Sequence, residues 1–112
     1  MSSVYETGYI YKILTNDREY IGSTNNFILR KSKHVSNCKS KSKKNDTILY
    51  RNMREANGKF FMSIISIHNN ITRKDLLELE EENRCLFKTE LNMIKCKKTK
   101  NKYLSYLEKY SK

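Results

Sequence analysis

The chain has 112 residues and a formal net charge of +11, from 23 Lys and Arg residues against 12 Asp and Glu residues. A chain of this length holds one domain with a single modest core, so we expect residues 1–112 to form one unit. The excess of positive charge favours a polyanionic partner, and nucleic acid is the simplest of these.

Membrane and secreted classes are disfavoured by the same sequence. No stretch approaches the roughly 20 apolar residues that span a bilayer. The first six residues lack the basic and apolar regions of a secretory signal. We therefore expect a soluble, intracellular protein with no membrane partner. The three cysteines show no C-x-x-C spacing, so we expect reduced thiols and no zinc site.

Tyr9–Leu14 is rich in aromatic and β-branched residues, and a second short run of this kind contains Tyr20 and Ile21. Between the two runs, Thr15-Asn16-Asp17 supplies turn residues, which predicts a β-hairpin. A helix is expected to follow from about residue 26 to residue 37. Arg30 and His34 are four residues apart, so they share one face of that helix.

The middle of the chain predicts a loop, a helix and a strand. Lys alternates with Ser over 39–44, a loop too charged to pack. Asn45 and Asp46 are candidate caps for a helix over about 47–57, with Gly58 as its stop. The apolar segment Phe60–Ile67 predicts a strand that is central in its sheet. Asn69-Asn70 would then turn the chain out of the sheet.

Thr72 and Asp75 form a capping box that opens a helix over about 73–88. The basic segment 93–112 contains aromatic and apolar residues at helical spacing, which favours a docked C-terminal helix. The inward stripe of the helix over 73–88 is expected to run through Leu76, Leu79, Asn83, Leu86 and Phe87.

A phosphodiester-cleaving site can be assembled from the polar residues. Glu80 lies beside the apolar stripe of its helix, where a charge is costly unless it is paired or bound to a metal. Arg30 suits a phosphate because its planar fork donates two hydrogen bonds and keeps its charge. Tyr11 and Tyr20 would face each other across the hairpin and could supply a base. Each residue alone also fits an ordinary role, as a solvated charge or a core aromatic.

The sequence contains the tripeptides Tyr9-Ile10-Tyr11 and Tyr20-Ile21-Gly22, the pair Arg30 and His34, and Glu80 and Asn92 twelve residues apart. Taken together, these motifs resemble those of the GIY-YIG nucleases. The resemblance runs from Gly8 to Asn92. It implies an α+β fold with a small three-stranded antiparallel sheet flanked by helices, and cleavage of DNA with one divalent cation, Mg²⁺ or Mn²⁺. It also implies site roles for Tyr11, Tyr20, Arg30, His34, Glu80 as the metal ligand, and Asn92 as a residue that steadies the site.

Two positions depart from the family pattern. The first motif reads Tyr-Ile-Tyr where Gly-Ile-Tyr is usual, with Gly8 one place earlier, and the retained Tyr11 should make this tolerable. Arg84 stands where an apolar residue is expected in the Glu80 helix.

DNA is the expected partner. Because no separate DNA-binding domain fits in this length, we expect sequence specificity to come from the domain itself, from a homodimer or from a partner protein. A catalytically inactive nucleic-acid-binding module and an RNA-associated basic protein remain alternatives. The lysines expected to contact DNA phosphates are Lys39, Lys41, Lys43, Lys44, Lys97, Lys98 and Lys100.

Overall fold

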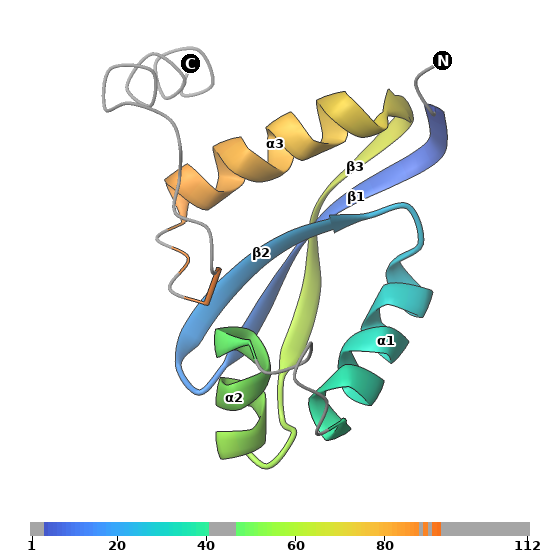
Figure 1. Cartoon of the computed structure of the whole chain (residues 1–112). Coiled ribbons are helices and arrows are strands. Elements are labelled where there is room, and N and C mark those ends of the chain that lie inside the picture. Colours follow the sequence, from blue (N-terminus) through green and yellow to red (C-terminus); the bar gives the residue numbers. More distant parts are fainter. Residues whose placement is uncertain (1–3, 41–46, 88, 90, 93–112) are drawn as a thin grey trace.

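The computed structural model describes residues 4–40, 47–87, 89, 91 and 92. Its elements follow the order β1 (Val4–Thr15), β2 (Arg18–Thr24), α1 (Phe27–Lys39), α2 (Ile48–Glu55), β3 (Phe61–Thr72) and α3 (Arg73–Leu86) (Figure 1). The strands form one antiparallel sheet in the order β2-β1-β3. The expected three-stranded sheet flanked by helices is therefore confirmed. The predicted C-terminal helix falls outside the described residues.

The β1–β2 hairpin closes through a two-residue turn. Asn16 and Asp17 both have positive φ, at 53° and 59°, as a type I′ turn requires, and Asn and Asp tolerate this conformation better than most residues. The resulting register pairs Tyr11 with Gly22 and Ile13 with Tyr20. The two site tyrosines therefore lie diagonally on one face of the hairpin and are not directly opposite each other.

The prediction that the third strand is central was wrong, because β1 pairs with both of its neighbours. The buried residues of β1 point to both faces of the sheet, and Ile10 and Tyr11 are 0% and 1% exposed. On β3, Phe61 is 76% exposed and Ile67 is 56% exposed. An apolar run fits a half-covered edge strand as well as a central one, so composition could not decide between them.

Asn69 and Asn70 were expected to leave the sheet, but both lie inside β3. Pairing with β1 continues past them to Val4 opposite Thr72. The longer β1 provides backbone partners for this stretch, and Asn70 takes up a positive φ of 51° without ending the strand.

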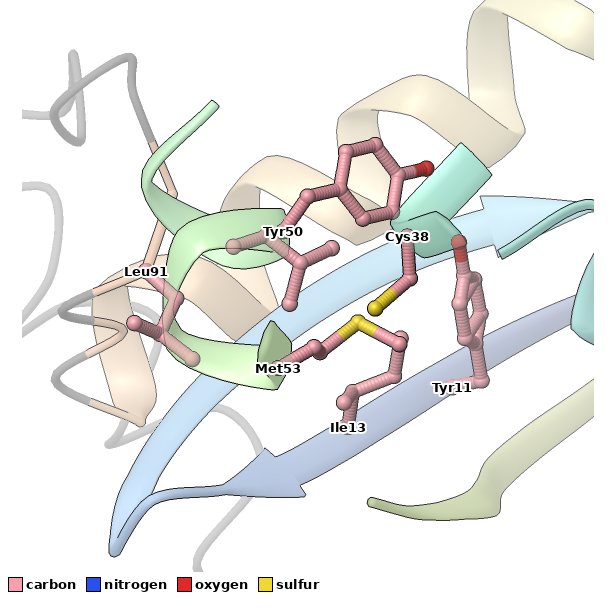
Figure 2. Packing of buried hydrophobic residues seen from close by; sticks show 7 residues of the cluster. Tyr11, Ile13, Cys38, Tyr50, Met53 and Leu91 are labelled. Atoms are coloured by element: carbon pink, nitrogen blue, oxygen red, sulfur yellow. The ribbon is translucent and has the colours of Figure 1, made fainter. Parts of the chain in front are cut away.

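Two clusters of buried side chains cover the two faces of the sheet. Alternate residues of β1 point to opposite faces. The first cluster joins Tyr11 and Ile13 to α1 and α2, as Figure 2 shows. The second joins Ile10 to α3. The members of the first cluster are Tyr11, Ile13, Cys38, Leu49, Tyr50, Met53 and Leu91.

The helix starts are fixed by local caps. The Asn26 side chain accepts from Leu29 N at the start of α1. Thr47, rather than Asn45 or Asp46, caps α2. The predicted role of Thr72 is confirmed, since its Oγ1 accepts from Asp75 N at 3.1 Å. On the inward stripe of α3, Leu76 and Asn83 are buried, and Leu79 and Phe87 pack against the second cluster.

Two of the cysteines, Cys38 and Cys85, differ in their covalent state. Cys38 is a buried free thiol, whereas Cys85 is disulfide-bonded. The expectation of reduced thiols was therefore wrong for Cys85, because disulfide formation depends on proximity in space, which sequence spacing does not report. None of the helices within the described ranges has the length and apolar character needed to cross a membrane.

Candidate active site

A pocket of about 310 Å³ lies beside β2, which forms the edge of the sheet opposite to β3. Residues from β2, α1, α2, α3 and the segment after α3 contribute to its wall. Four of the six predicted catalytic residues, Tyr20, Arg30, Glu80 and Asn92, therefore line a single pocket. The full lining consists of Tyr20, Arg30, Thr47, Leu49, Tyr50, Glu80, Arg84, Leu91 and Asn92.

Asn92 attaches the segment after α3 to the outer edge of β2. Its Oδ1 accepts from Ile21 N at 3.0 Å, and its Nδ2 donates to Ile21 O at 2.8 Å. Leu91 N donates to Glu19 O at 3.1 Å. The side-chain amide thus pairs with backbone groups that an edge strand would otherwise leave to solvent. This geometry suits a residue that holds the pocket wall in place.

Tyr11 is not one of the residues that line the pocket, but it contacts two site residues. Its Oη is 2.9 Å from His34 Nε2 and accepts from Arg30 Nε at 3.4 Å. A Cβ atom on Gly22 would overlap the Tyr11 ring, so the glycine of the second motif provides the space for this phenol. Burial raises the pKa of Tyr11 well above its ordinary value, and the Arg30 contact opposes this only in part. Tyr11 is therefore a neutral phenol at pH 7.

His34 joins Tyr11 to a tyrosine of α2. The imidazole is fully buried, and its Nδ1 is 2.9 Å from Tyr50 Oη, which also accepts from Asn37 Nδ2 at 3.2 Å. Burial, together with the charge of Arg30, lowers the pKa of His34 to about 4. The ring is neutral at pH 7, with one nitrogen donating and the other accepting. His34 Nε2 can therefore accept a hydrogen bond from Tyr11 Oη, while its lowered pKa makes it a weak base.

Tyr20 brings a second phenol to the same place. Its ring centroid is 6.3 Å from that of Tyr11 and 6.0 Å from that of His34. Burial raises its pKa, and the Glu80 carboxylate raises it further. Unlike Tyr11, Tyr20 lines the pocket itself.

Glu80 comes from α3, on the other side of the sheet from α1. Ser23 Oγ of β2 donates to its Oε1 at 2.8 Å. Burial raises the pKa of Glu80, while the Ser23 hydrogen bond and the charge of Arg84 act in the opposite direction. One oxygen of the carboxylate is thus held by β2, which fixes the orientation of the group in the pocket.

The donor set suits a hard divalent cation that takes most of its ligands from elsewhere. Within the described ranges, no three His, Cys, Asp or Glu side chains gather closely enough to hold a metal ion. A single oriented carboxylate still fits Mg²⁺, because this ion keeps several waters and combines one or two carboxylates with substrate phosphate. Glu80 fits that role.

Among the residues that sequence reasoning missed are Ser23, Tyr50 and Arg84, which lie beside predicted site residues. Ser23 and Tyr50 reach their partners over separations of 57 and 16 residues. Arg84 was noted only as an irregularity, although it follows Glu80 by four residues and so shares its face of the helix. For Tyr50, the available signal was its position three residues before Met53, on the buried side of α2.

Of the lysines predicted to contact DNA, Lys39 is the exposed last residue of α1. The remaining six lie outside the described residues. These are Lys41, Lys43, Lys44, Lys97, Lys98 and Lys100.

Comparison with known proteins yields one family. The family model for the GIY-YIG catalytic domain matches residues 7–103, which is most of the chain. No curated protein and no solved structure matches the sequence.

Proposed function

Because the chain belongs to the GIY-YIG family of nucleases, we propose that it is a metal-dependent DNA endonuclease that hydrolyses phosphodiester bonds in the pocket beside β2. The single observation that carries this proposal is that Glu80 and Arg30, fifty residues apart, line the same pocket. A carboxylate among phosphate-binding groups repels DNA unless a cation neutralises it. Cleavage uses such a carboxylate, whereas binding alone gains nothing from it.

Arg30 is the group we assign to the scissile phosphate. Its guanidinium can donate two parallel hydrogen bonds to non-bridging oxygens, where negative charge builds up in the transition state. The contact between Arg30 Nε and Tyr11 Oη holds the side chain against the sheet. Arg30 therefore begins the reaction already oriented, which saves reorganisation during catalysis.

The proton of the attacking water is proposed to leave through the buried phenols. A neutral phenol is a weak base at pH 7, but a nearby cation and the charge of Arg30 would both favour the phenolate, which can take a proton from the attacking water. His34 Nε2 lies 2.9 Å from Tyr11 Oη, so the imidazole can accept a hydrogen bond from this phenol. Burial and the charge of Arg30 make His34 a weak base, with a pKa of about 4, so we assign it the role of orienting Tyr11, with Tyr50 on the other side of the imidazole.

Glu80 is the residue we assign to a single Mg²⁺ or Mn²⁺. When bound, such an ion would polarise the phosphate and offset charge on the leaving oxygen. The protein's own contribution is the orientation of the carboxylate by Ser23. Asn92 holds the neighbouring wall by pairing with Ile21.

Replacing Tyr11 with Phe is expected to reduce the single-turnover cleavage rate more than replacing Tyr20 with Phe. Tyr11→Phe removes the hydroxyl that contacts both Arg30 and His34. Tyr20→Phe keeps both contacts and serves as the matched control. If Tyr20→Phe has the larger effect, the role of base passes to Tyr20, which lines the pocket.

His34 should make folding stability depend on pH. The pKa of His34 is lowered from 6.5 to about 4 in the folded protein, so the unfolded chain binds a proton first as the pH falls. Stability from this residue is therefore intact above pH 6.5 and is lost between pH 6.5 and 4, by about 3 kcal/mol. Chemical denaturation of wild type and His34→Gln across this range should show a steeper loss for wild type. Parallel curves would contradict a buried neutral His34.

The lysines at 39–44 are proposed to hold DNA through its phosphates without reading sequence. Each phosphate contact adds about 0.9 to the slope of log affinity against log salt on B-DNA. Changing Lys39, Lys41, Lys43 and Lys44 to Gln should flatten that slope by roughly two to four units. Cleavage at saturating protein should persist, because the changes leave Arg30 and Glu80 in place. An unchanged slope would leave Lys97, Lys98 and Lys100 as the candidate DNA contacts.

A catalytically inactive module that binds nucleic acid is the main alternative. Incubation of the protein with supercoiled plasmid and Mg²⁺ or Mn²⁺ separates the two functions. Nicked or linear product that disappears with excess EDTA supports the endonuclease. A retarded but intact plasmid supports the binding module, and cleavage that persists in EDTA would overturn the single-metal mechanism.

A further inference from the structure

Two guanidinium groups line the pocket, and the proposed reaction uses only one of them. Arg30 comes from α1, and Arg84 comes from α3 on the other side of the sheet. We infer that Arg84 is a second phosphate-binding residue of the site, holding a backbone phosphate of the bound DNA strand beside Glu80. This inference rests on the proposed function and names a further substrate contact for it.

Arg84 lies one helical turn after Glu80, the proposed metal ligand. Glu80 and Arg84 are separated by four residues, so their side chains project from neighbouring points on one face of α3. Both line the pocket. A phosphate that approaches Glu80 through a bound cation would therefore come close to Arg84 as well.

The Arg84 side chain is largely buried although it is charged and lines the pocket. The side chain is 9% exposed, and its Nη1 is 3.6 Å from Glu81 Oε2. A long cationic side chain on a helix surface normally extends into water, because desolvating its charge is costly. Here the charge is kept at the wall of a pocket that opens to solvent, where Glu81 offsets part of that cost.

The charges of the pocket also favour this role. Glu80 and the neighbouring Glu81 contribute one negative charge each, and Arg30 and Arg84 contribute one positive charge each, so these four groups balance before a cation binds. A structural ion pair with Glu81 alone would not require Arg84 to line the pocket that holds Arg30. With a divalent cation on Glu80 the same groups would carry a net charge of +2, which suits a DNA backbone, and a guanidinium can bind a phosphate through two parallel hydrogen bonds.

The test is duplex DNA binding in EDTA as a function of salt, which measures phosphate contacts without cleavage. Arg84→Gln should weaken binding by about tenfold and lower the slope of log affinity against log salt by about 0.9. Arg73→Gln, at the exposed start of the same helix, is the matched control and should leave both values at the wild-type level. Arg84→Lys keeps the charge and should restore the slope.

A folded Arg84→Gln protein with wild-type affinity and slope would overturn the inference and leave Arg84 as a partner of Glu80 and Glu81 only. If Arg84→Gln does not fold, Arg84→Lys decides through cleavage with Mg²⁺. A bidentate phosphate contact predicts a loss of about tenfold in kcat/KM for the lysine variant, and wild-type kcat/KM would overturn it. Failure of the proposed function is a separate result: the wild type would then bind duplex without cutting it, and the salt slopes could still be compared.

Discussion

Glu80→Gln is expected to abolish cleavage while leaving DNA binding unchanged or stronger. The substitution removes the carboxylate proposed to bind the divalent cation, which supplies several kcal/mol of transition-state stabilisation, so a loss of about a thousandfold or more in single-turnover rate is expected. It also removes a negative charge from a pocket that faces DNA. Glutamine keeps an oxygen that can accept from Ser23 Oγ, so the fold should be preserved.

The matched control for this variant is Glu78→Gln. Glu78 is an exposed residue of the same helix and does not line the pocket. The Glu78→Gln protein should therefore cleave DNA at the wild-type rate. A Glu80→Gln protein that cuts as fast as wild type would require Glu78, Glu81 or Glu82 to be tested as the metal ligand.

Arg30→Lys should lose about a hundredfold in single-turnover rate although the positive charge is kept, since removal of one transition-state donor typically has this effect. An ammonium group cannot reproduce the planar fork of a guanidinium. It would also lose the Nε contact that holds Arg30 against Tyr11. Lys31→Arg is the control for a change of cation type, because Lys31 is exposed on the same helix. Unchanged turnover in Arg30→Lys would assign Arg30 to general DNA attraction.

The local parts of the fold could be predicted from the sequence. Asn16 and Asp17 carry the conformational preference of the hairpin turn, and Thr72 caps α3 through a bond to Asp75 three residues away. These features depend on neighbouring residues, so the sequence reports them directly. The order of the strands depends on which strand pairs with both others, and the composition of Phe60–Ile67 carries no such information.

The same distinction applies to the site. Arg30 and His34 could be placed on one helix face from their spacing. Their contacts with Tyr11 are set by the docking of α1 on the sheet. The roles of Ser23 and Tyr50 could not be found from spacing, because their partners Glu80 and His34 belong to other elements. The family resemblance predicted that Glu80 and Arg30 belong to one site. Sequence spacing alone could not, because it gives no distance between residues on different elements.

The central claim is that this pocket hydrolyses DNA with a divalent cation held by Glu80. The most direct test is the single-turnover cleavage rate of a labelled duplex as a function of Mg²⁺ concentration, for wild type and Glu80→Gln. We predict a rate that rises from zero in EDTA and saturates with Mg²⁺ for wild type, and no detectable cleavage for the variant at any Mg²⁺ concentration. Cleavage by wild type in EDTA, or the same Mg²⁺ dependence in both proteins, would contradict the claim.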